Sequence, residues 1–321
     1  MKNCCILFNE PGKDAQVDEL DILDQVFFVE THLKNLGVSS YRKGITSAFM
    51  TEMEALKTEN PDFVFNLTES IGNKGELLYF IPALLNMHSI SYTGNPLEAM
   101  FLTTSKILTS KHLNLYGIPS PGYYLPSQWN KLTEGSKYII KPVWEDGSMG
   151  ITSDSVFTYQ VGYEKRFASF SDTHWFIQDF IDGREFNISI LQGDNGPEVL
   201  PPAEMIFVDY DENRPRIVDF KAKWEHNSFE YRNTVRYFPG NDIEHELLQK
   251  LKEIALLTWD AFNLNGYARI DLRVDGKGQP FVIEINANPC ISEDGGFVAA
   301  TIEAGYRFPE VLERIVKHLN F

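Results

Sequence analysis

The sequence predicts an α/β protein built from several lobes. In the N-terminal third, short runs of apolar residues alternate with amphipathic helices, which is typical of an open parallel α/β layer. Later segments alternate apolar and polar residues, which is typical of strands with one face on a core. With 321 residues, 43% of them hydrophobic, the chain can bury one large core or two to three smaller ones.

The N-terminal part reads as strand, loop and helix, repeated. Cys4 to Phe8 form an apolar run that predicts a buried strand, and Phe63 to Leu67 form another. A helix follows each strand, one with an apolar stripe at Ile22, Val26, Val29, Leu33 and Leu36, the other through Leu77, Leu78, Phe80, Ile81, Leu84 and Leu85. We expect residues 1–96 to form a Rossmann-like domain.

Two further lobes are expected, over residues 97–180 and 181–321. The first begins with a helix from Leu97 past Lys106 to Tyr116, where Gly117-Ile118-Pro119 is a stop signal. Besides a helix over 244–262, the remaining elements are strands, expected at 138–141, 155–157, 175–180, 185–191, 203–208, 267–274 and 281–286.

Charge and cysteine content exclude several classes of protein. The 45 acidic and 29 basic residues give a net charge of −16, spread along the chain, so nucleic acid and anionic membrane are not expected partners. No apolar run approaches the ~20 residues of a membrane span, and we expect a cytoplasmic protein. Cys4, Cys5 and Cys290 have neither disulfide nor metal-ligand spacing, and we interpret them as buried thiols.

The most informative segment is the hairpin predicted around Asp275-Gly276-Lys277-Gly278. If Val274 lies opposite Phe281, then Asp271 faces Glu284 and Arg269 faces Asn286. Those four polar side chains then share one face of the sheet. The opposite, apolar face carries Ile270, Leu272, Val274, Ile283 and Ile285.

Two carboxylates directly opposite each other repel unless a cation lies between them. Magnesium suits Asp271 and Glu284, because it prefers a few oxygen ligands and completes its shell with water and phosphate. Asn286 adds a neutral oxygen, and Arg269 can hold a phosphate or an oxyanion.

Three other segments are weaker indications. Lys141 ends a strand and precedes a small-residue loop, Glu145 to Gly150, whose amides can close over a polyphosphate. The break between two strands from Trp175 to Glu185 can read a base edge and ribose hydroxyls, although such a break is more often only a connection. Taken alone, Lys106 and Lys223 are ordinary lysines.

In order along the chain, these segments resemble the ATP-grasp superfamily, and specifically the D-alanine–D-alanine ligase family, over nearly the whole sequence. The matching runs are Phe65-Asn66-Leu67, Ser91-Tyr92-Thr93-Gly94, Lys106-Ile107-Leu108-Thr109, Gly117-Ile118-Pro119, Ile140-Lys141-Pro142, Asp182-Gly183-Arg184-Glu185-Phe186, Lys221-Ala222-Lys223, Ala268-Arg269-Ile270-Asp271 and Glu284-Ile285-Asn286-Ala287-Asn288-Pro289. Each run is weak evidence by itself, but the ordered set is specific.

The resemblance implies an ATP-grasp fold and an ATP site between the central and C-terminal lobes. Lys106, Lys141 and Lys223 would contact phosphates, Gln178, Asp179 and Ile181 the adenine, and Glu185 the ribose. Asp271, Glu284 and Asn286 would bind two Mg²⁺ ions, and Mn²⁺ is an alternative metal. The implied partners are a small carboxylate and a small amine, and the resemblance also allows a homodimer.

The implied reaction activates the carboxylate as an acylphosphate, which the amine then attacks. Arg269, Lys223 and Ser148 are the candidate catalytic residues, with Arg269 on the tetrahedral oxyanion. The loop after Lys141 would close and exclude water.

Departures from the family pattern concern the substrates. Gly147-Ser148 replaces paired serines, Trp224 replaces a tyrosine, Cys290 replaces a glycine, and the serine expected for the second substrate's carboxylate falls at Gly295. Glu293 and Asp294 add negative charge there, which favours an amine-rich or uncharged nucleophile. Further candidate substrate residues are Asn288 and, for a substrate ammonium, Glu10 and Glu69.

The sequence leaves three functions open. The first is an amino-acid or dipeptide ligase that is not an efficient D-alanine–D-alanine ligase. The second is a carboxylate kinase, or a cyclising ligase with an internal nucleophile, on the same ATP site. The third is a non-catalytic ATP-binding regulator, against which the intact Arg269, Asp271, Glu284 and Asn286 argue, since a sensor does not need a transition-state arginine.

Overall fold

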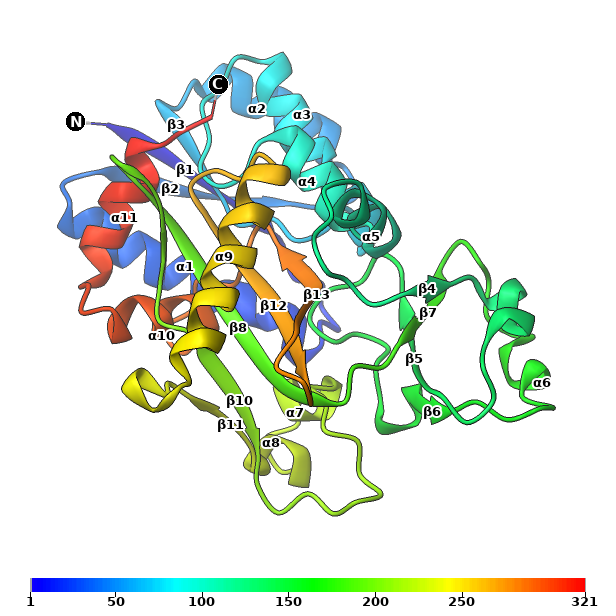
Figure 1. The fold of residues 1–321 in the computed structure, drawn as a ribbon. Helices are drawn as coiled ribbons and strands as arrows, with labels where there is room; N and C mark the ends of the chain where they lie inside the picture. Colours follow the sequence, from blue (N-terminus) through cyan, green and yellow to red (C-terminus); the bar gives the residue numbers. More distant parts are fainter. Residues whose placement is uncertain (1, 321) are drawn as a thin grey trace.

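The computed structural model describes residues 2–320, which form three β-sheets and the helices that cover them (Figure 1). This mixed α/β architecture confirms the predicted fold class. Among the described residues, no helix combines the length and the hydrophobicity needed to cross a membrane.

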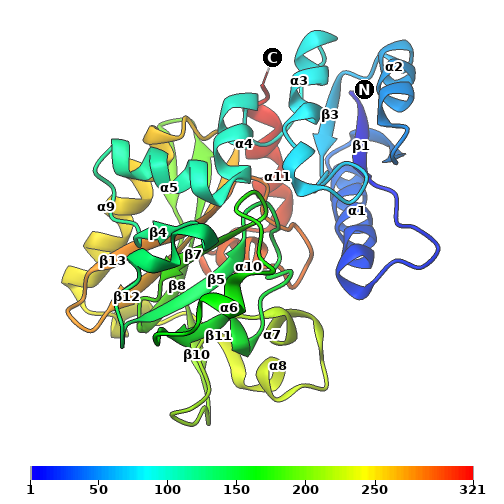
Figure 2. The same ribbon diagram turned by 90° about the vertical axis from the view of Figure 1, so that its right-hand side faces the viewer.

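The first sheet is parallel, with strand order β2-β1-β3. Its strands are β1 (Asn3–Asn9), β2 (Ser39–Ile45) and β3 (Phe63–Asn66), and its helices are α1 (Val17–Asn35), α2 (Phe49–Glu59) and α3 (Phe80–Met87). Alternate residues of β1 face opposite layers: Cys4 and Ile6 pack with α1, whereas Cys5 and Leu7 pack with α2 and α3. The sheet is therefore covered on both faces, as Figure 2 shows.

The second sheet is antiparallel, with strand order β4-β7-β5-β6. Its strands are β4 (Tyr123–Tyr124), β5 (Lys137–Pro142), β6 (Val156–Thr158) and β7 (Trp175–Asp179). The short helix α6 (Glu164–Phe167) lies between β6 and β7 along the chain. One face carries its own small core, which includes Tyr138, Ile140, Phe157 and Ile177. The other face is left for the site described below.

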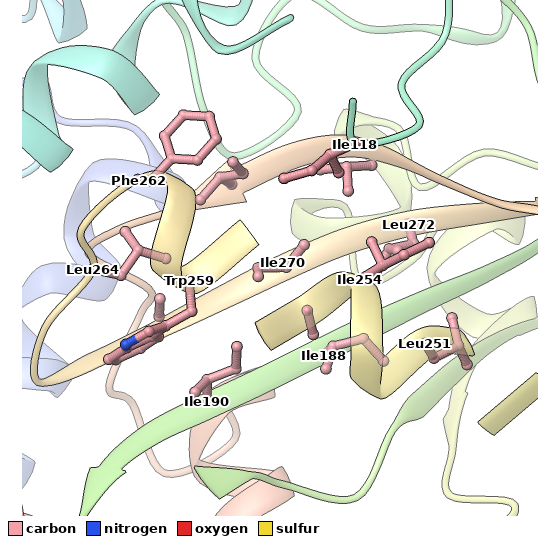
Figure 3. Packing of buried hydrophobic residues seen from close by; sticks show 14 of the residues in the cluster. Ile118, Ile188, Ile190, Leu251, Ile254, Trp259, Phe262, Leu264, Ile270 and Leu272 are labelled. Carbon is pink, nitrogen blue, oxygen red and sulfur yellow. The ribbon is translucent and has the colours of Figure 1, made fainter. Parts of the chain in front are cut away.

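The third sheet has strand order β11-β10-β8-β12-β13, with β9 paired to β8. Its elements are β8 (Gly183–Gly193), β9 (Gly196–Val199), β10 (Ala203–Phe207), β11 (Thr234–Tyr237), β12 (Tyr267–Asp275), β13 (Pro280–Asn286) and the covering helix α9 (His245–Ala261). Figure 3 shows Leu251, Ile254 and Trp259 of α9 over isoleucines of β8 and β12. This packing buries one face of β8, β12 and β13.

The remaining helices join these layers. They are α4 (Leu97–Thr104), α5 (Lys106–Leu115), α7 (Phe220–Trp224), α8 (Phe229–Asn233), α10 (Gly296–Glu303) and α11 (Phe308–Lys317). Met100 of α4 and Leu113 of α5 enter the core under α9, and Phe297 and Val311 of α10 and α11 enter the core of the first sheet. The lobe boundaries at 96/97 and 180/181 stay a prediction.

Two predicted helices have different limits. The helix expected from Leu97 to Tyr116 is wrong as a single element, because the backbone is extended at Ser105, whose Oγ accepts the Leu108 N–H at 3.3 Å and caps α5. The helix expected through Leu77 to Leu85 begins only at Phe80, after a single 3₁₀ turn over Gly75–Leu77.

Asn95 links the first and third sheets from a buried position. Its Nδ2 donates to the Tyr267 carbonyl at 2.8 Å and to the Ala287 carbonyl at 2.6 Å, and its Oδ1 accepts the Asn265 N–H at 2.7 Å. The start of β12 and the end of β13 are thereby tied to the segment between α3 and α4.

We expect Asn95→Ala to lower the free energy of unfolding by about 3 kcal/mol or more, because it leaves buried backbone groups without partners. Urea denaturation measures the change. Asn130→Ala, at an exposed position, is the control and should change stability by less than about 0.5 kcal/mol. Equal stability of the two variants would refute the structural role of Asn95.

Candidate functional site

A cavity of about 520 Å³ lies between the second sheet and the polar face of the third sheet. Residues from β5, β7, β8, β12 and β13 line it, together with the loop after β5 and the segment around α7. It brings together eleven of the residues singled out in the sequence: Lys106, Lys141, Ser148, Gln178, Asp179, Ile181, Glu185, Lys223, Arg269, Asp271 and Glu284.

The β12–β13 hairpin has the expected central register, with Asp271 opposite Glu284 and Arg269 opposite Asn286. The assumed pairing of Val274 with Phe281 is wrong, because Val274 pairs with Pro280. A β-bulge at Ile283 absorbs the difference and turns Ile283 into the cavity, while Val282 takes the core position. Ile283 therefore does not lie on the apolar face.

Each of the two facing carboxylates has its own cation. Asp271 accepts two hydrogen bonds from Arg269, at 2.7 and 2.8 Å. Glu284 lies 3.0 Å from the Lys106 ammonium. Burial would raise the pKa of Glu284, but Lys106, Lys223 and Lys141 outweigh it and hold that pKa below its usual range. Glu284 is thus ionised at neutral pH.

The donor set fits a hard cation. Asp271, Glu284 and Asn286 offer carboxylate and amide oxygens on one strand pair, with no sulfur or imidazole among them. No group of three or more acidic, histidine or cysteine side chains in residues 2–320 could form an all-protein cage. Such a sparse set suits Mg²⁺, which keeps water and phosphate ligands, although Asn286 now donates to Asp271 at 3.1 Å.

Three lysines approach these acids from different elements. Lys106 is buried and donates to the Glu145 carbonyl at 2.6 Å and to Asp146 at 2.9 Å. Lys141 donates to Gln178 Oε1 at 3.0 Å, and burial lowers its pKa to about 8. Burial, and after it the charge of Arg269, lowers the pKa of Lys223. The electrostatic cost of burying Lys141 and Lys223 indicates a binding site for an anion.

The end of the cavity next to β7 is less charged. Ile139, Phe180 and Ile181 provide apolar surface, and Gln178 and Asp179 provide polar edges. The Gln178 oxygen faces Lys141, so its amide nitrogen is directed elsewhere. This mixture suits a flat heterocycle with hydrogen-bonding edges.

Arg273 is a residue of this cavity that the sequence analysis missed. Its guanidinium donates to Glu185 at 2.8 Å and to the carbonyl oxygens of Ile181 and Gly183, at 2.7 and 3.0 Å. It therefore fixes both Glu185 and the segment after β7. The same period-two alternation that placed Arg269 and Asp271 on one face could have identified it.

The loop after β5 and the segment before α8 meet over the cavity. Ser148 Oγ donates to the Val218 carbonyl at 2.7 Å, and the Trp224 indole N–H donates to the Gly147 carbonyl at 3.0 Å. Gly147 and Ser148 both have positive φ, at 65° and 64°. These contacts keep the loop close to Lys223 and restrict the access of water.

Three predicted substrate residues do not line this cavity. Glu10 is exposed beside Gly44. Glu69 accepts a hydrogen bond from Gln25 at 3.2 Å. Asn288 accepts from the Tyr267 hydroxyl at 3.0 Å and donates to the Thr68 carbonyl at 2.9 Å.

Other predicted residues also lie beside the cavity instead of in its wall. Trp224 and Asn286 act on it only through their hydrogen bonds to Gly147 and Asp271. At Gly295, a Cβ atom would lie 3.0 Å from the carbonyl oxygens of Cys290 and Ser292. A side chain at position 295 would therefore be tightly packed against this loop.

The charge at this end differs from the sequence expectation. Asp294 lines the cavity, but its carboxylate accepts the Ser292 hydroxyl at 2.8 Å, and Glu293 is exposed and outside the lining. Arg236, which the sequence analysis did not use, lines the same end. The positive charge of Arg236 therefore offsets part of the negative charge that the sequence predicted at this end.

A second depression, of about 630 Å³, lies between the β8–β9 turn and α11. Its basic residues Arg314 and Lys317 pair with Glu198 and Asp194. It contains no arrangement comparable to the facing carboxylates and lysines, so we assign the chemistry to the smaller cavity.

Comparisons with known proteins agree with the sequence resemblance. Residues 130–317 match the family described as D-ala D-ala ligase C-terminus. The D-alanine–D-alanine ligase of Carboxydothermus hydrogenoformans is 30% identical over 277 residues, covering 82% of this chain and 83% of that protein. An uncharacterized protein, y4sG of Sinorhizobium fredii, is 29% identical over 256 residues, covering 79% of this chain and 73% of that protein.

Among solved structures, the D-alanine–D-alanine ligase of Bacillus anthracis superposes with a TM-score of 0.75 at 16% identity, covering 99% of this chain and 97% of that one. The same ligase complexed with ATP gives a TM-score of 0.69. At this identity the likeness establishes the shared fold.

The lowered pKa of Lys141 predicts a proton uptake. At pH 8.5 the free Lys141 amine is mostly neutral, whereas a bound polyphosphate favours the ammonium, so binding should take up as much as about one proton. The uptake should vanish below about pH 7, where Lys141 is already charged. Calorimetry of a non-hydrolysable ATP analogue in buffers of different ionisation enthalpy measures it.

Lys141→Met should reduce this uptake, and Lys137→Met, an exposed lysine on the same strand, should not. Equal uptake in the two variants would show that Lys141 does not meet the phosphates.

Proposed function

Because the chain belongs to the D-alanine–D-alanine ligase family and is thus an ATP-dependent ligase with the ATP-grasp fold, we propose that it joins a carboxylate to an amine through an acylphosphate. The observation that carries this proposal is the pair Asp271 and Glu284, facing each other beside Arg269 in a cavity that three lysines enter. A reaction that moves a phosphoryl group needs this concentration of fixed charge.

We assign the nucleotide to the end of the cavity next to β7. Ile181, Gln178 and Asp179 would hold the adenine, and Glu185, oriented by Arg273, would hold the ribose. Lys106, Lys141 and Lys223 would bind the phosphates. In support of this, burial lowers the pKa of Lys141 and of Lys223, an electrostatic cost that a polyphosphate would offset.

Asp271, Glu284 and Asn286 would hold magnesium, which when bound neutralises charge on the phosphates. Lys106 and Arg269, the present partners of the two acids, would then be available to phosphate and substrate oxygens. An exchange of partners of this kind keeps each buried charge compensated before and after ligand binding.

In the proposed reaction a carboxylate oxygen attacks the γ-phosphorus and ADP leaves. The amine nitrogen then attacks the acyl carbon, inorganic phosphate leaves, and the nitrogen loses a proton. Arg269 would stabilise the oxyanion of the tetrahedral intermediate. The contacts of Ser148 and Trp224 would keep water from the acylphosphate while the amine binds.

We further propose that the substrate pair differs from two D-alanines. The hydroxyl expected to hold the second substrate's carboxylate is replaced by Gly295, where a Cβ atom would lie only 3.0 Å from two carbonyl oxygens. Ser292, the neighbouring hydroxyl, already donates to Asp294. A D-alanine whose carboxylate lies next to position 295 would therefore lack this hydrogen bond.

We expect Glu284→Gln to abolish magnesium-dependent ADP release without unfolding the chain, because Lys106 keeps its second partner Asp146. Turnover and circular dichroism together test this. Asp260→Asn, an exposed acid on α9, is the control and should retain activity. Wild-type turnover by the Gln variant would remove Glu284 from the metal site.

We expect no efficient synthesis of D-alanyl-D-alanine. The protein is incubated with ATP, magnesium and millimolar D-alanine, and the dipeptide is measured by mass spectrometry. Turnover near the ~10 per second of a typical enzyme would mean that the substitutions at Gly147, Trp224 and Gly295 do not change the substrate.

A further inference from the structure

Arg236 lies on the cavity face of the third sheet, as the strand register shows. It pairs with Met205 of β10, which pairs with Glu185 of β8, which in turn pairs with Arg273 of β12. Side chains in one such row share a face. Glu185, Arg273 and Arg236 all line the cavity.

The Arg236 guanidinium has spare hydrogen-bonding capacity. Its Nη1 donates to the Asp294 carbonyl at 3.0 Å. Among residues 2–320, no carboxylate lies within 4.0 Å of it in an ion pair, and none of its other donors is assigned a hydrogen bond. A guanidinium has five N–H donors, so a planar fork remains for a second partner.

Arg236 differs in this respect from its neighbour Arg269. Both guanidinium groups border Gly296, where a Cβ atom would lie 3.6 Å from Arg269 Nη1 and 3.8 Å from Arg236 Nη2. Arg269 is neutralised by two hydrogen bonds to Asp271. Although Arg236 is exposed at one side, partial desolvation of its guanidinium, and after it the charge of Arg269, lowers its pKa. A bound anion would relieve this unfavourable arrangement.

The position of Arg236 indicates which substrate it meets. In the proposed reaction the acyl carbon lies between the acids Asp271 and Glu284 and the oxyanion-binding Arg269. The guanidinium groups of Arg236 and Arg269 both border Gly296, whereas the nucleotide is assigned to the end of the cavity next to β7. The group that Arg236 meets is therefore assigned to the amine substrate, which must come next to the acyl carbon at Arg269.

We propose that Arg236 binds a free carboxylate of the amine substrate and so selects amines that carry one. This inference rests on the proposed ligase function and names a specificity residue for it. A guanidinium fork matches a carboxylate bidentately. It would supply the recognition that Gly295, which has no hydroxyl, cannot supply.

The experiment is a competition within one reaction. Each D- or L-amino acid is mixed with its own carboxamide, and these mixtures are combined in pairs and incubated with ATP, magnesium and the full chain. The products that end in a carboxylate and those that end in a carboxamide are quantified by mass spectrometry. The wild type should favour the product ending in carboxylate. Arg236→Gln should lower that ratio by about tenfold or more, with the KM for ATP unchanged, and Arg236→Lys should restore part of it.

Arg232→Gln is the matched control. Arg232 is exposed on α8, donates to backbone carbonyls as Arg236 does, and is outside the cavity. It should leave the ratio unchanged. If Arg236→Gln slows both products equally, or lowers only the melting temperature, Arg236 merely supports the loop at Asp294 and the proposal is overturned.

A binding experiment distinguishes failure of the proposed ligase function from failure of the role of Arg236. Calorimetry of each amino acid and its carboxamide against protein loaded with magnesium and a non-hydrolysable ATP analogue requires no turnover. Carboxylate-selective binding that Arg236→Gln abolishes, without ADP release by the wild type, would support the role of Arg236 and reject the ligase. Binding without such selectivity, or no binding of any amino compound, would reject the role of Arg236.

Discussion

The facing carboxylates Asp271 and Glu284 are the constraint on which the rest of the site depends. Strand pairing places them side by side in a largely buried position, where two uncompensated negative charges would be very costly. Arg269 and Lys106 offset that cost from two different elements. The same alternation sends Ile270 and Leu272 into the core under α9, so the electrostatics of the site and the packing of the sheet are fixed by one register.

The charge of the cavity changes along its length, and the proposed chemistry follows that order. Apolar residues and Gln178 lie at one end, lysines and the two acids in the middle, and Arg269 with Arg236 at the other end. Hydrogen bonds from Ser148 and Trp224 hold the loop after β5 against the segment before α8, over the middle part of the cavity. A phosphorylated carboxylate would thus form where positive charge is highest and water access is lowest.

Periodicity predicted the elements that bury many apolar residues, such as β1, α1, β12 and α9. It missed β2, because Ser39–Ile45 is a polar edge strand that is mostly half-exposed. The bulge at Ile283 could not be predicted, since alternation gives no sign of an inserted residue. Arg236 was missed for another reason: its strand, Thr234–Tyr237, is short and exposed, and only its pairing with Met205 shows which face it occupies.

The most direct test of the central claim is the fate of the carboxylate oxygen. With the substrate pair that supports ADP release, the carboxylate is labelled with ¹⁸O, and the inorganic phosphate and the product are analysed by mass spectrometry. Attack of the carboxylate on the γ-phosphorus predicts that one labelled oxygen is transferred to the phosphate in each turnover. Phosphate without the label, formed together with the amide, would contradict activation through an acylphosphate in this cavity.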